Sequence, residues 1–177
     1  MTQAQNNFNN PSFEGEPQDA TMPVGWVGCA EWTTPDILPG YWGVYTEPAD
    51  GETFVGIITR RDGTFENITQ RLKTPLLKDK CYAFSVSLAH SRSYSGYNGN
   101  IALKVWGGNS KCEKAQLLYE TEPIENSKWL NHNIQFKPKN EIRYLIFEAS
   151  FKKGTSTPYN GNLLIDNISP INWCGRA

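Results

Sequence analysis

The feature that most constrains the fold is a succession of short, strand-like segments with no clear helix between them. Segments with alternating or β-branched apolar residues occupy 52–59, 65–72, 81–90, 100–107, 129–138, 143–151 and 161–169. Turn signals such as Asp-Gly at 62–63 and Asn-Gly at 160–161 separate them. Only 111–123 could hold a helical turn, and it reads equally well as a loop and a strand. Such a pattern predicts an all-β, antiparallel β-sandwich.

The length and composition of the chain indicate one soluble domain. Its 177 residues are enough for a single core, and 38% hydrophobic with 20% charged residues is a globular composition. No internal repeat or linker interrupts it. We therefore expect one domain over 9–172, with tails at 1–8 and 173–177.

Charge and hydropathy exclude several classes of partner. A net charge of −1 argues against nucleic acid, whose binding proteins usually carry a basic excess. No apolar run is long enough to insert into a membrane. The first residues have neither the basic nor the apolar region of a signal peptide, which suggests a mature, exported protein whose signal has been removed.

The four cysteines point to an oxidising compartment. They are dispersed and form no CxxC pair, so zinc-ribbon spacing is absent. Four cysteines allow three pairings, of which we favour Cys81–Cys112 with Cys29–Cys174, because the second bond would tie the chain ends together. The alternative is four free thiols in a cytosolic protein.

Alternation within two strands suggests a binding surface. One face of 81–90 is small and uncharged: Ala83, Ser85, Ser87 and Ala89. Such a smooth floor suggests that a ligand lies on it, or that another loop packs over it. In 143–151 the outward residues are Tyr144, Ile146, Glu148 and Ser150, which we expect on the same surface. In 100–107, Lys104 and Trp106 oppose Leu103 and Val105.

Two long polar loops, 91–100 and 152–161, each follow a strand and carry tyrosines. Long ordered loops at strand ends often hold binding residues. Tyr94 and Tyr97 lie among Ser, Gly and Asn, where we expect neither to reach a core. With Tyr159, they become candidate walls of a binding groove.

A carboxylate ends the last strand-like segment. Asp166 follows three apolar residues, and a carboxylate near a core needs a partner. Glu14 lies at the edge of a possible first strand, and the first and last strands of a sandwich are often neighbours. Two close carboxylates repel unless they are protonated or bridged by a cation, and Ca²⁺ prefers oxygen ligands. The alternative is that Asp166 caps a turn through its own backbone.

The stretches "NPSFE" near the start, "PLLKDKCYAFSVSLA" in the middle and "LLIDNIS" at the end resemble β-jelly-roll carbohydrate-binding modules of families 4, 9 and 22. The resemblance spans 9–171 and implies a jelly-roll fold within the galactose-binding-domain-like superfamily. It also implies a structural Ca²⁺ held by Glu14 and Asp166, with Asn10 and Ser12 at the same corner. The middle of the chain is similar to domains in exported surface proteins of Bacteroidetes-type bacteria.

The same resemblance implies a glycan-binding groove on the concave sheet. Sugar rings stack on aromatic faces, and their hydroxyls pair with amides, carboxylates and guanidinium groups. The resemblance implies Glu148 and Arg60, or Arg61 if the strand bulges, as groove residues. The other candidates are Trp106 as a platform, Tyr94, Tyr97 and Tyr159 as walls, and, more weakly, Arg92 and Gln70. Arg60 has an alternative role as an ion-pair partner of Glu66 or Glu148.

We expect a non-catalytic, monomeric, extracellular module that binds a polysaccharide and belongs to a larger exported protein. The alternative is a structural or adhesive domain of a bacterial cell-surface protein, with no sugar groove. No GxSxG, HExxH or phosphate loop is present, so we do not expect an enzyme. The catalytic candidates are Glu148 with His90 or Tyr144. Strand parity directs His90 away from the face of Glu148 unless a bulge intervenes, and fold alone does not imply catalysis.

Overall fold

The computed structural model describes residues 6–174. Its strands are β1 (Asp36–Leu38), β2 (Phe54–Thr59), β3 (Asn67–Leu76), β4 (Tyr82–Ala89), β5 (Gly99–Asn100), β6 (Ala102–Gly108), β7 (Gln116–Glu120), β8 (Leu130–Phe136), β9 (Ile142–Ser150), β10 (Gly161–Asp166) and β11 (Asn172–Trp173). The described residues contain no helix, and so none that could span a membrane. The ambiguous segment 111–123 is a loop followed by β7.

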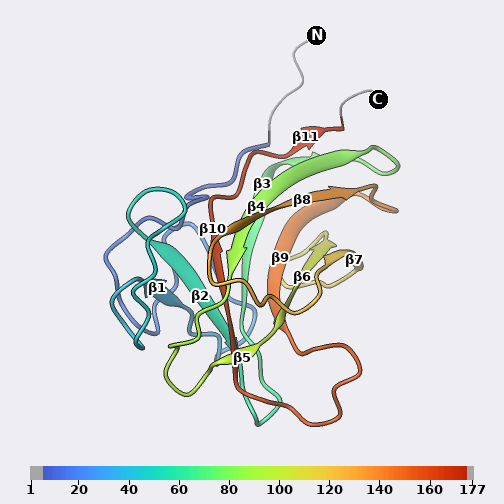
Figure 1. Ribbon diagram of the computed structural model, residues 1–177. Helices are drawn as coiled ribbons and strands as arrows, with labels where there is room; N and C mark the ends of the chain where they lie inside the picture. Colours follow the sequence, from blue (N-terminus) through green and yellow to red (C-terminus); the bar gives the residue numbers. More distant parts are fainter. Residues whose placement is uncertain (1–5, 175–177) are drawn as a thin grey trace.

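The strands form two sheets (Figure 1). The larger sheet runs β1-β2-β10-β4-β11, with β8 beside β4 and β5 beside β10. The smaller sheet runs β3-β9-β6-β7. Every pairing between named strands is antiparallel except the short β5–β10 contact. The predicted antiparallel sandwich is therefore confirmed.

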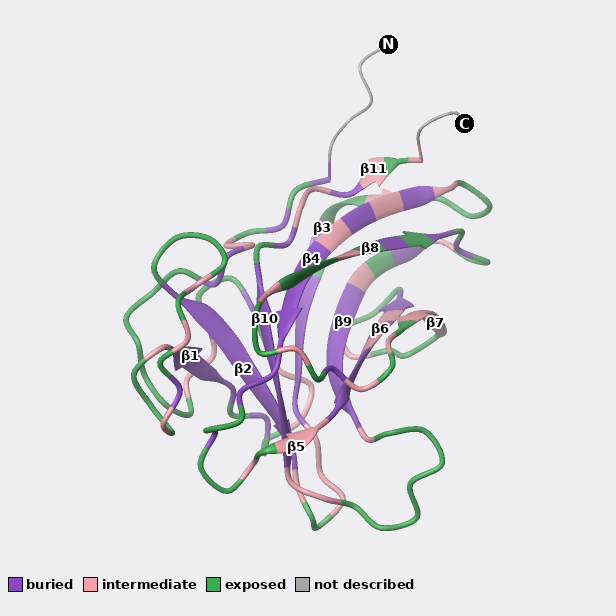
Figure 2. Cartoon of the chain, in the orientation of Figure 1, coloured by how far each residue is buried: buried purple, intermediate pink, exposed green. Residues whose placement is uncertain are grey.

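The main core lies between the two sheets and comes from strand alternation (Figure 2). Val86 and Leu88 of β4 meet Leu145 and Phe147 of β9 there, and all four are buried. A second apolar cluster lies on the outer side of the larger sheet, where loop residues cover it. Its members are Leu38, Val44, Phe54, Ile58, Ala89, Tyr94 and Leu164.

The folded region extends beyond the expected boundaries of 9–172. Asn6 pairs with Ile171 in an antiparallel bridge, and Phe8 is buried in the main core. Trp173 belongs to β11, so the expected tails at 1–8 and 173–177 are partly wrong. The parts of those tails at 1–5 and 175–177 lie outside the described residues.

Disulfides are confirmed, but the favoured pairing is wrong. The bonds are Cys29–Cys112 and Cys81–Cys174. β11 pairs with the start of β4, and the Cys174 N–H donates to the Cys81 carbonyl at 2.9 Å, which places these two cysteines together. This pairing depends on a two-residue strand that carries no sequence signal of its own.

Candidate functional site

The predicted site residues lie on two opposite surfaces. β4 and β9 belong to different sheets, and both direct their apolar residues into the one core between the sheets. Their other faces must therefore look away from each other. The small face of β4 and the Glu148 face of β9 do not form one surface, so that expectation is wrong.

The small face of β4 is half covered. Ala89 lies beneath the second apolar cluster, as the loop alternative predicted. Ala83 and Ser85 are partly exposed and line a shallow hollow of about 460 Å³ together with Asn133 and Gln135 of β8. This end of the face is polar and carries no aromatic platform.

Tyr94 is a core residue and not a groove wall. Its side chain is 1% exposed, and its hydroxyl donates to the Asp36 carboxylate. Burial raises the pKa of Tyr94 and also raises the pKa of Asp36. The expectation failed because the 91–98 loop folds back over the outer side of the larger sheet and creates a second core there.

The other residues of this loop stay on the same side of the sandwich. Tyr97 is half-buried and contacts Trp42 edge-to-face, with ring centroids 6.0 Å apart, and Tyr94 at 6.3 Å. Arg92 is exposed. The loop does not join Trp106 in one site, because Trp106 lies on the smaller sheet.

The outer side of the smaller sheet brings the remaining candidates together. The register places Glu148 directly between Asn67 of β3 and Lys104 of β6. Two residues farther along each strand, and therefore on the same face, Ile146 of β9 lies beside Trp106 of β6. Carboxylate, lysine and indole therefore occupy neighbouring positions of one sheet face, which is the arrangement that strand parity predicted for Lys104 and Trp106.

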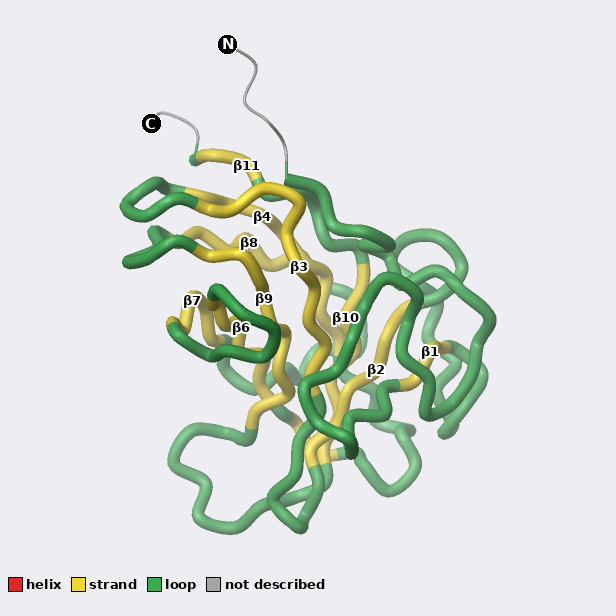
Figure 3. The backbone as a smooth tube through the Cα atoms, turned by 180° about the vertical axis from the view of Figure 1, so that it is seen from behind, coloured by secondary structure: helices red, strands yellow, loops and turns green. Residues whose placement is uncertain are grey.

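The loop between β6 and β7, residues 109–115, crosses this face and is called the strap below. It lies in front of the smaller sheet in Figure 3, which views the molecule from behind. Its Cys112 is bonded to Cys29, and Cys29 follows a segment paired with the outer edge of β3 through Val27. Ile146, an outward residue of β9, is only 1% exposed on this face.

Lys114 of the strap closes a small network over the sheet. Its ammonium lies 2.8 Å from the Glu148 carboxylate. It also lies 5.5 Å from the Trp106 ring centroid and 5.3 Å from that of Phe65. The Trp106 indole N–H donates to the other oxygen of Glu148 at 3.3 Å. These contacts hold the indole and the carboxylate in fixed positions before any ligand arrives.

Below the strap is an open groove of about 500 Å³. Trp106, Glu148 and Lys104 form its floor, and the 151–155 loop forms a wall. A second hollow of about 280 Å³ lies beyond Lys114 and Phe65, lined by Trp32 and the Cys29–Cys112 bond. The two hollows share Lys114 and Phe65, so these two side chains separate them.

Tyr159 supports the wall of the groove instead of facing it. Its hydroxyl donates to the Asn100 carbonyl at 2.7 Å and accepts the Lys152 N–H at 3.0 Å. Its ring packs edge-to-face against Phe151, with centroids 5.5 Å apart. Tyr159 therefore positions the 151–155 loop.

Arg60 is a structural residue, as its alternative reading stated. Its guanidinium lies 2.6 Å from the Glu66 carboxylate, whose side chain is fully buried. Burial raises the pKa of Glu66 to about 7, and Arg60 opposes that rise. Arg61 is exposed in the turn after β2. Gln70 is also structural, because it bonds the main chain of Asn9 and Gly25.

Of the residues that line the groove, only Trp106 and Glu148 were predicted as site residues, and Lys104 was noted only for its strand parity. The residues missed at the sequence level include Phe65, Lys114, Glu120, Lys152 and Lys153. Lys114 lies in the ambiguous 111–123 segment, and its position over the sheet depends on the bond between Cys29 and Cys112. The available signal was strand alternation, which places Lys104 and Trp106 on the side opposite the apolar residues and so predicts a polar and aromatic face.

The carboxylate corner is held by main-chain donors. Asp166 is fully buried, and one of its oxygens accepts the N–H groups of Ala49 and Asp50 at 2.8 and 3.0 Å. The other oxygen accepts the Asn167 N–H at 2.7 Å, which is the backbone cap of the alternative reading. Burial raises the pKa of Asp166 to about 7, and the nearby Asp50 charge adds to the rise.

Glu14 holds the same loop from the other side. Its carboxylate accepts the N–H of Glu52 at 3.0 Å. Gly51 has a positive φ of 64°, and a side chain there would collide with this carboxylate. The Asn10 amide bonds the main chain of Glu14 in both directions, with its oxygen accepting the Glu14 N–H at 2.8 Å.

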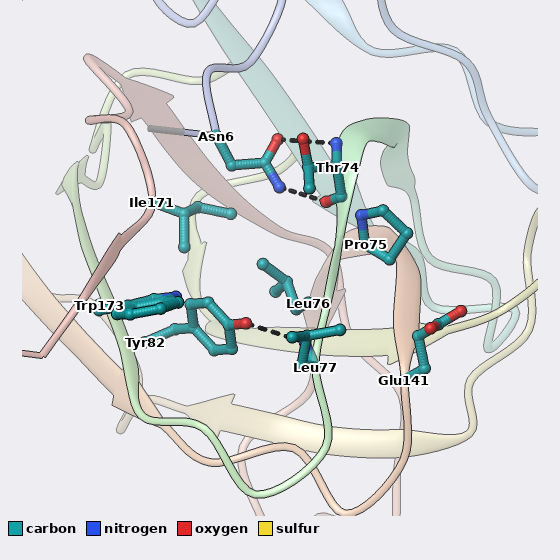
Figure 4. Close-up of a pocket in the computed structure, with 9 residues that line it drawn as sticks. All are labelled: Asn6, Thr74, Pro75, Leu76, Leu77, Tyr82, Glu141, Ile171 and Trp173. Carbon is teal, nitrogen blue, oxygen red and sulfur yellow. Dashed lines mark hydrogen bonds between the residues drawn. The ribbon is translucent and has the colours of Figure 1, made fainter. Parts of the chain in front are cut away.

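A further hollow of about 190 Å³ lies at the end of the sandwich near β11 (Figure 4). It is mainly apolar, with Trp173 and Tyr82 side by side. The Tyr82 hydroxyl accepts the Leu77 N–H at 2.8 Å, and the Asn6 amide donates to the Thr74 carbonyl at 2.5 Å. These two hydrogen bonds hold the N-terminal segment and the turn between β3 and β4 in place.

No family model matches the chain, and no curated protein matches it in sequence. Solved structures do match its whole length. The xylan-binding family 22 module of Paenibacillus barcinonensis Xyn10C aligns with a TM-score of 0.60 and 14% identity over 100% of both chains. The fold is the jelly roll of carbohydrate-binding modules. A Fischerella cyclase in its apo form aligns equally well, with a TM-score of 0.60 and 13% identity over 98% of both chains.

A third match is the K3 cleaved adhesin domain of Lys-gingipain from Porphyromonas gingivalis. It aligns with a TM-score of 0.54 and 14% identity over 96% of both chains. One jelly roll thus serves a sugar-binding module, a cyclase and an adhesin domain. At these identities the likeness establishes the fold, and function has to be argued from the groove.

Proposed function

We propose that this domain is a non-catalytic carbohydrate-binding module, and that its site is the groove below the strap. The observation that carries the proposal is the fixed Trp106–Glu148 pair on the groove floor. The indole offers a flat apolar surface on which a sugar ring can stack. Lys104 beside it supplies a donor for hydroxyl groups, and Glu148, which Lys114 and the indole N–H engage, fixes the orientation of the ring. The xylan-binding match supports this choice.

A Trp106→Ala substitution tests the proposal. We expect the dissociation constant for soluble xylan or another bound polysaccharide to rise at least about tenfold, because a stacked aromatic in a groove is a typical hot spot. Affinity electrophoresis against a panel of polysaccharides, followed by calorimetry, measures it. Trp106 is half-buried at the sheet surface, so the variant should remain folded.

Trp173→Ala is the matched control, since this tryptophan is exposed on β11, outside the groove. Equal binding by the Trp106 variant and the native protein would place the sugar elsewhere. Absence of binding to every polysaccharide tested would favour the adhesive-domain alternative, for which the gingipain match is the supporting observation.

We also propose a structural Ca²⁺ at the carboxylate corner. The expected ligands Asn10, Glu14 and Asp166 lie at this corner, with Asp50 in the adjoining 49–53 loop. Their oxygens are of the type that suits a hard cation, and a bound cation would take over oxygens that accept main-chain N–H groups. Ser12 donates to Asp50 at 2.7 Å at the same corner. Residues 6–174 contain no group of three His, Cys, Asp or Glu side chains placed to bind a metal. Main-chain carbonyls and water would therefore complete the shell.

Thermal unfolding in CaCl₂ and in EDTA tests the calcium proposal. At a concentration near 100 times its dissociation constant, a ligand of the native state adds about 2.7 kcal/mol, or roughly 5–10 °C for a domain of this size. Asp166→Asn should abolish the difference, whereas Asp62→Asn, an exposed acid in the turn after β2, should keep it. Identical melting curves in CaCl₂ and EDTA would contradict the proposal.

We place this module outside the cell, as a monomeric part of a larger exported protein. Its two disulfides support an oxidising compartment. Size-exclusion chromatography of the native protein tests the monomer.

A further inference from the structure

The groove carries more positive charge than the chain as a whole. Four lysines and two glutamates line it, although the whole chain has a net charge of −1. The lysines are Lys104, Lys114, Lys152 and Lys153, and the glutamates are Glu120 and Glu148. A cleft with an excess of one sign of charge attracts ligands of the opposite sign.

The two glutamates offset this charge only in part. Glu148 is buried, with one oxygen 2.8 Å from the Lys114 ammonium and the other accepting from Trp106. Glu120 lies 3.9 Å from Lys104 in a loose, partly exposed pair. Exposed pairs of this kind contribute little. The Lys104 ammonium also lies 6.0 Å from the Trp106 ring centroid, so a ligand that reaches the indole lies next to this charge.

The wall of the groove supplies the remaining charge. Lys152 and Lys153 are exposed on the 151–155 loop, and no ion pair engages either of them within residues 6–174. Tyr159 fixes the start of this loop by accepting the Lys152 N–H. The loop therefore presents two ammonium groups from a supported backbone, at the edge of a floor that holds an indole.

We propose that the groove selects an acidic glycan, one whose sugar rings carry carboxylate or sulfate groups. This inference rests on the proposed sugar-binding function and names its ligand class. A sugar ring stacks on Trp106, and its anionic substituent lies between Lys104 on the floor and Lys152 or Lys153 on the wall. Carboxylate and sulfate share the chemistry that lysine recognises, which is a compact anion accepting from an ammonium group.

Matched polymers test the inference, because they differ in charge and share a backbone. Polygalacturonate is compared with its methyl ester, and dextran sulfate with dextran, in calorimetry at 0.05 M and 0.5 M salt. We expect one acidic polymer to bind roughly tenfold more tightly than its neutral partner at low salt, and the preference to shrink at high salt. The first comparison reports a carboxylate and the second a sulfate.

The double variant K152Q/K153Q should reduce the preference for the acidic polymer over its neutral partner by about three- to tenfold. The control K78Q/K80Q removes the same charge from the exposed turn between β3 and β4, at the other end of β3. It should change neither affinity. Poly-glutamate, an anion without sugar rings, should bind at least tenfold more weakly than the preferred acidic polymer.

These experiments can refute the acidic-glycan inference without refuting the glycan-binding function. Neutral polymers that bind through Trp106 as tightly as acidic ones would overturn the acidic-glycan inference and leave the glycan-binding function intact. Poly-glutamate binding as tightly as the acidic glycan would also overturn the inference, by showing general attraction to anions. Absence of binding to all of these polymers and to xylan would overturn both.

Discussion

Replacing Tyr94 by alanine is expected to lower the free energy of unfolding by about 3–5 kcal/mol. The side chain is 1% exposed and lies in the second apolar cluster, against the outer side of the larger sheet. Truncation would leave a cavity and would also remove the hydroxyl that donates to the buried Asp36 carboxylate. Urea unfolding followed by tryptophan fluorescence measures the change.

Two variants separate the causes of this loss. Tyr94→Phe keeps the ring and removes only the hydrogen bond to Asp36, so it should cost about 1–3 kcal/mol. Tyr97→Ala, in the same loop and half-buried, is the control and should cost less than Tyr94→Ala. Native stability of the Tyr94→Ala protein would show that the second cluster does not stabilise the fold.

Tyr94 also shows where sequence reasoning ends. Its Ser/Gly/Asn surroundings are typical of an exposed loop, and nothing local signals that the loop folds back over a sheet. The strands themselves were predictable, because alternation is a property of neighbouring residues. β2, β4, β8 and β10 lie within the predicted segments, and β6 and β9 each extend one residue beyond theirs. In contrast, β1, β5 and β11, at two or three residues each, have no detectable period.

Alternation indicates which residues avoid the core, and it does not indicate which sheet a strand joins. Ala83 and Glu148 were both correctly read as outward, yet they face opposite sides of the sandwich. Sheet membership depends on pairings between distant segments, such as β10 between β2 and β4. The predicted cysteine pairing was wrong for the same reason, because the Cys81–Cys174 bond depends on the pairing of β11 with the distant β4. Part of the candidate site was nevertheless predictable, because alternation places both Trp106 and Glu148 on outward faces. The pairing of β6 with β9 then brings them together on one face.

Arg60 carries the other large effect. Arg60→Met keeps most of the length of the side chain and removes its charge, which leaves the fully buried Glu66 carboxylate without its ion-pair partner. A buried charge that loses its ion-pair partner becomes protonated where that costs less, and the pKa of Glu66 is already about 7 in the native protein. Because one pKa unit corresponds to about 1.4 kcal/mol, we expect the loss of the ion pair to lower the free energy of unfolding by about 1.4 kcal/mol at pH 8, measured by urea unfolding.

The stability that Arg60→Met loses should depend on pH, and the protonation of Glu66 determines whether the loss is larger at high or at low pH. Burial raises the folded-state pKa of Glu66 to about 7, above its ordinary value of 4.5. A carboxyl with a raised pKa contributes most stability below its unfolded pKa, and that contribution is lost as the pH rises through 7. Without Arg60 the pKa of Glu66 rises further, so at pH 5 the group is neutral and needs no ion-pair partner. The variant should therefore be much closer to native stability at pH 5 than at pH 8.

Arg61→Met is the matched control for this pH dependence. Arg61 is the next residue along the chain, is exposed, and makes no ion pair among residues 6–174. Its replacement should change stability by less than about 0.5 kcal/mol at either pH. If Arg60→Met were equally destabilising at pH 5 and pH 8, the charge of Glu66 would not be the cause. The loss would then come from other Arg60 contacts, such as its hydrogen bond to the Trp32 carbonyl at 3.2 Å, which do not titrate in this range.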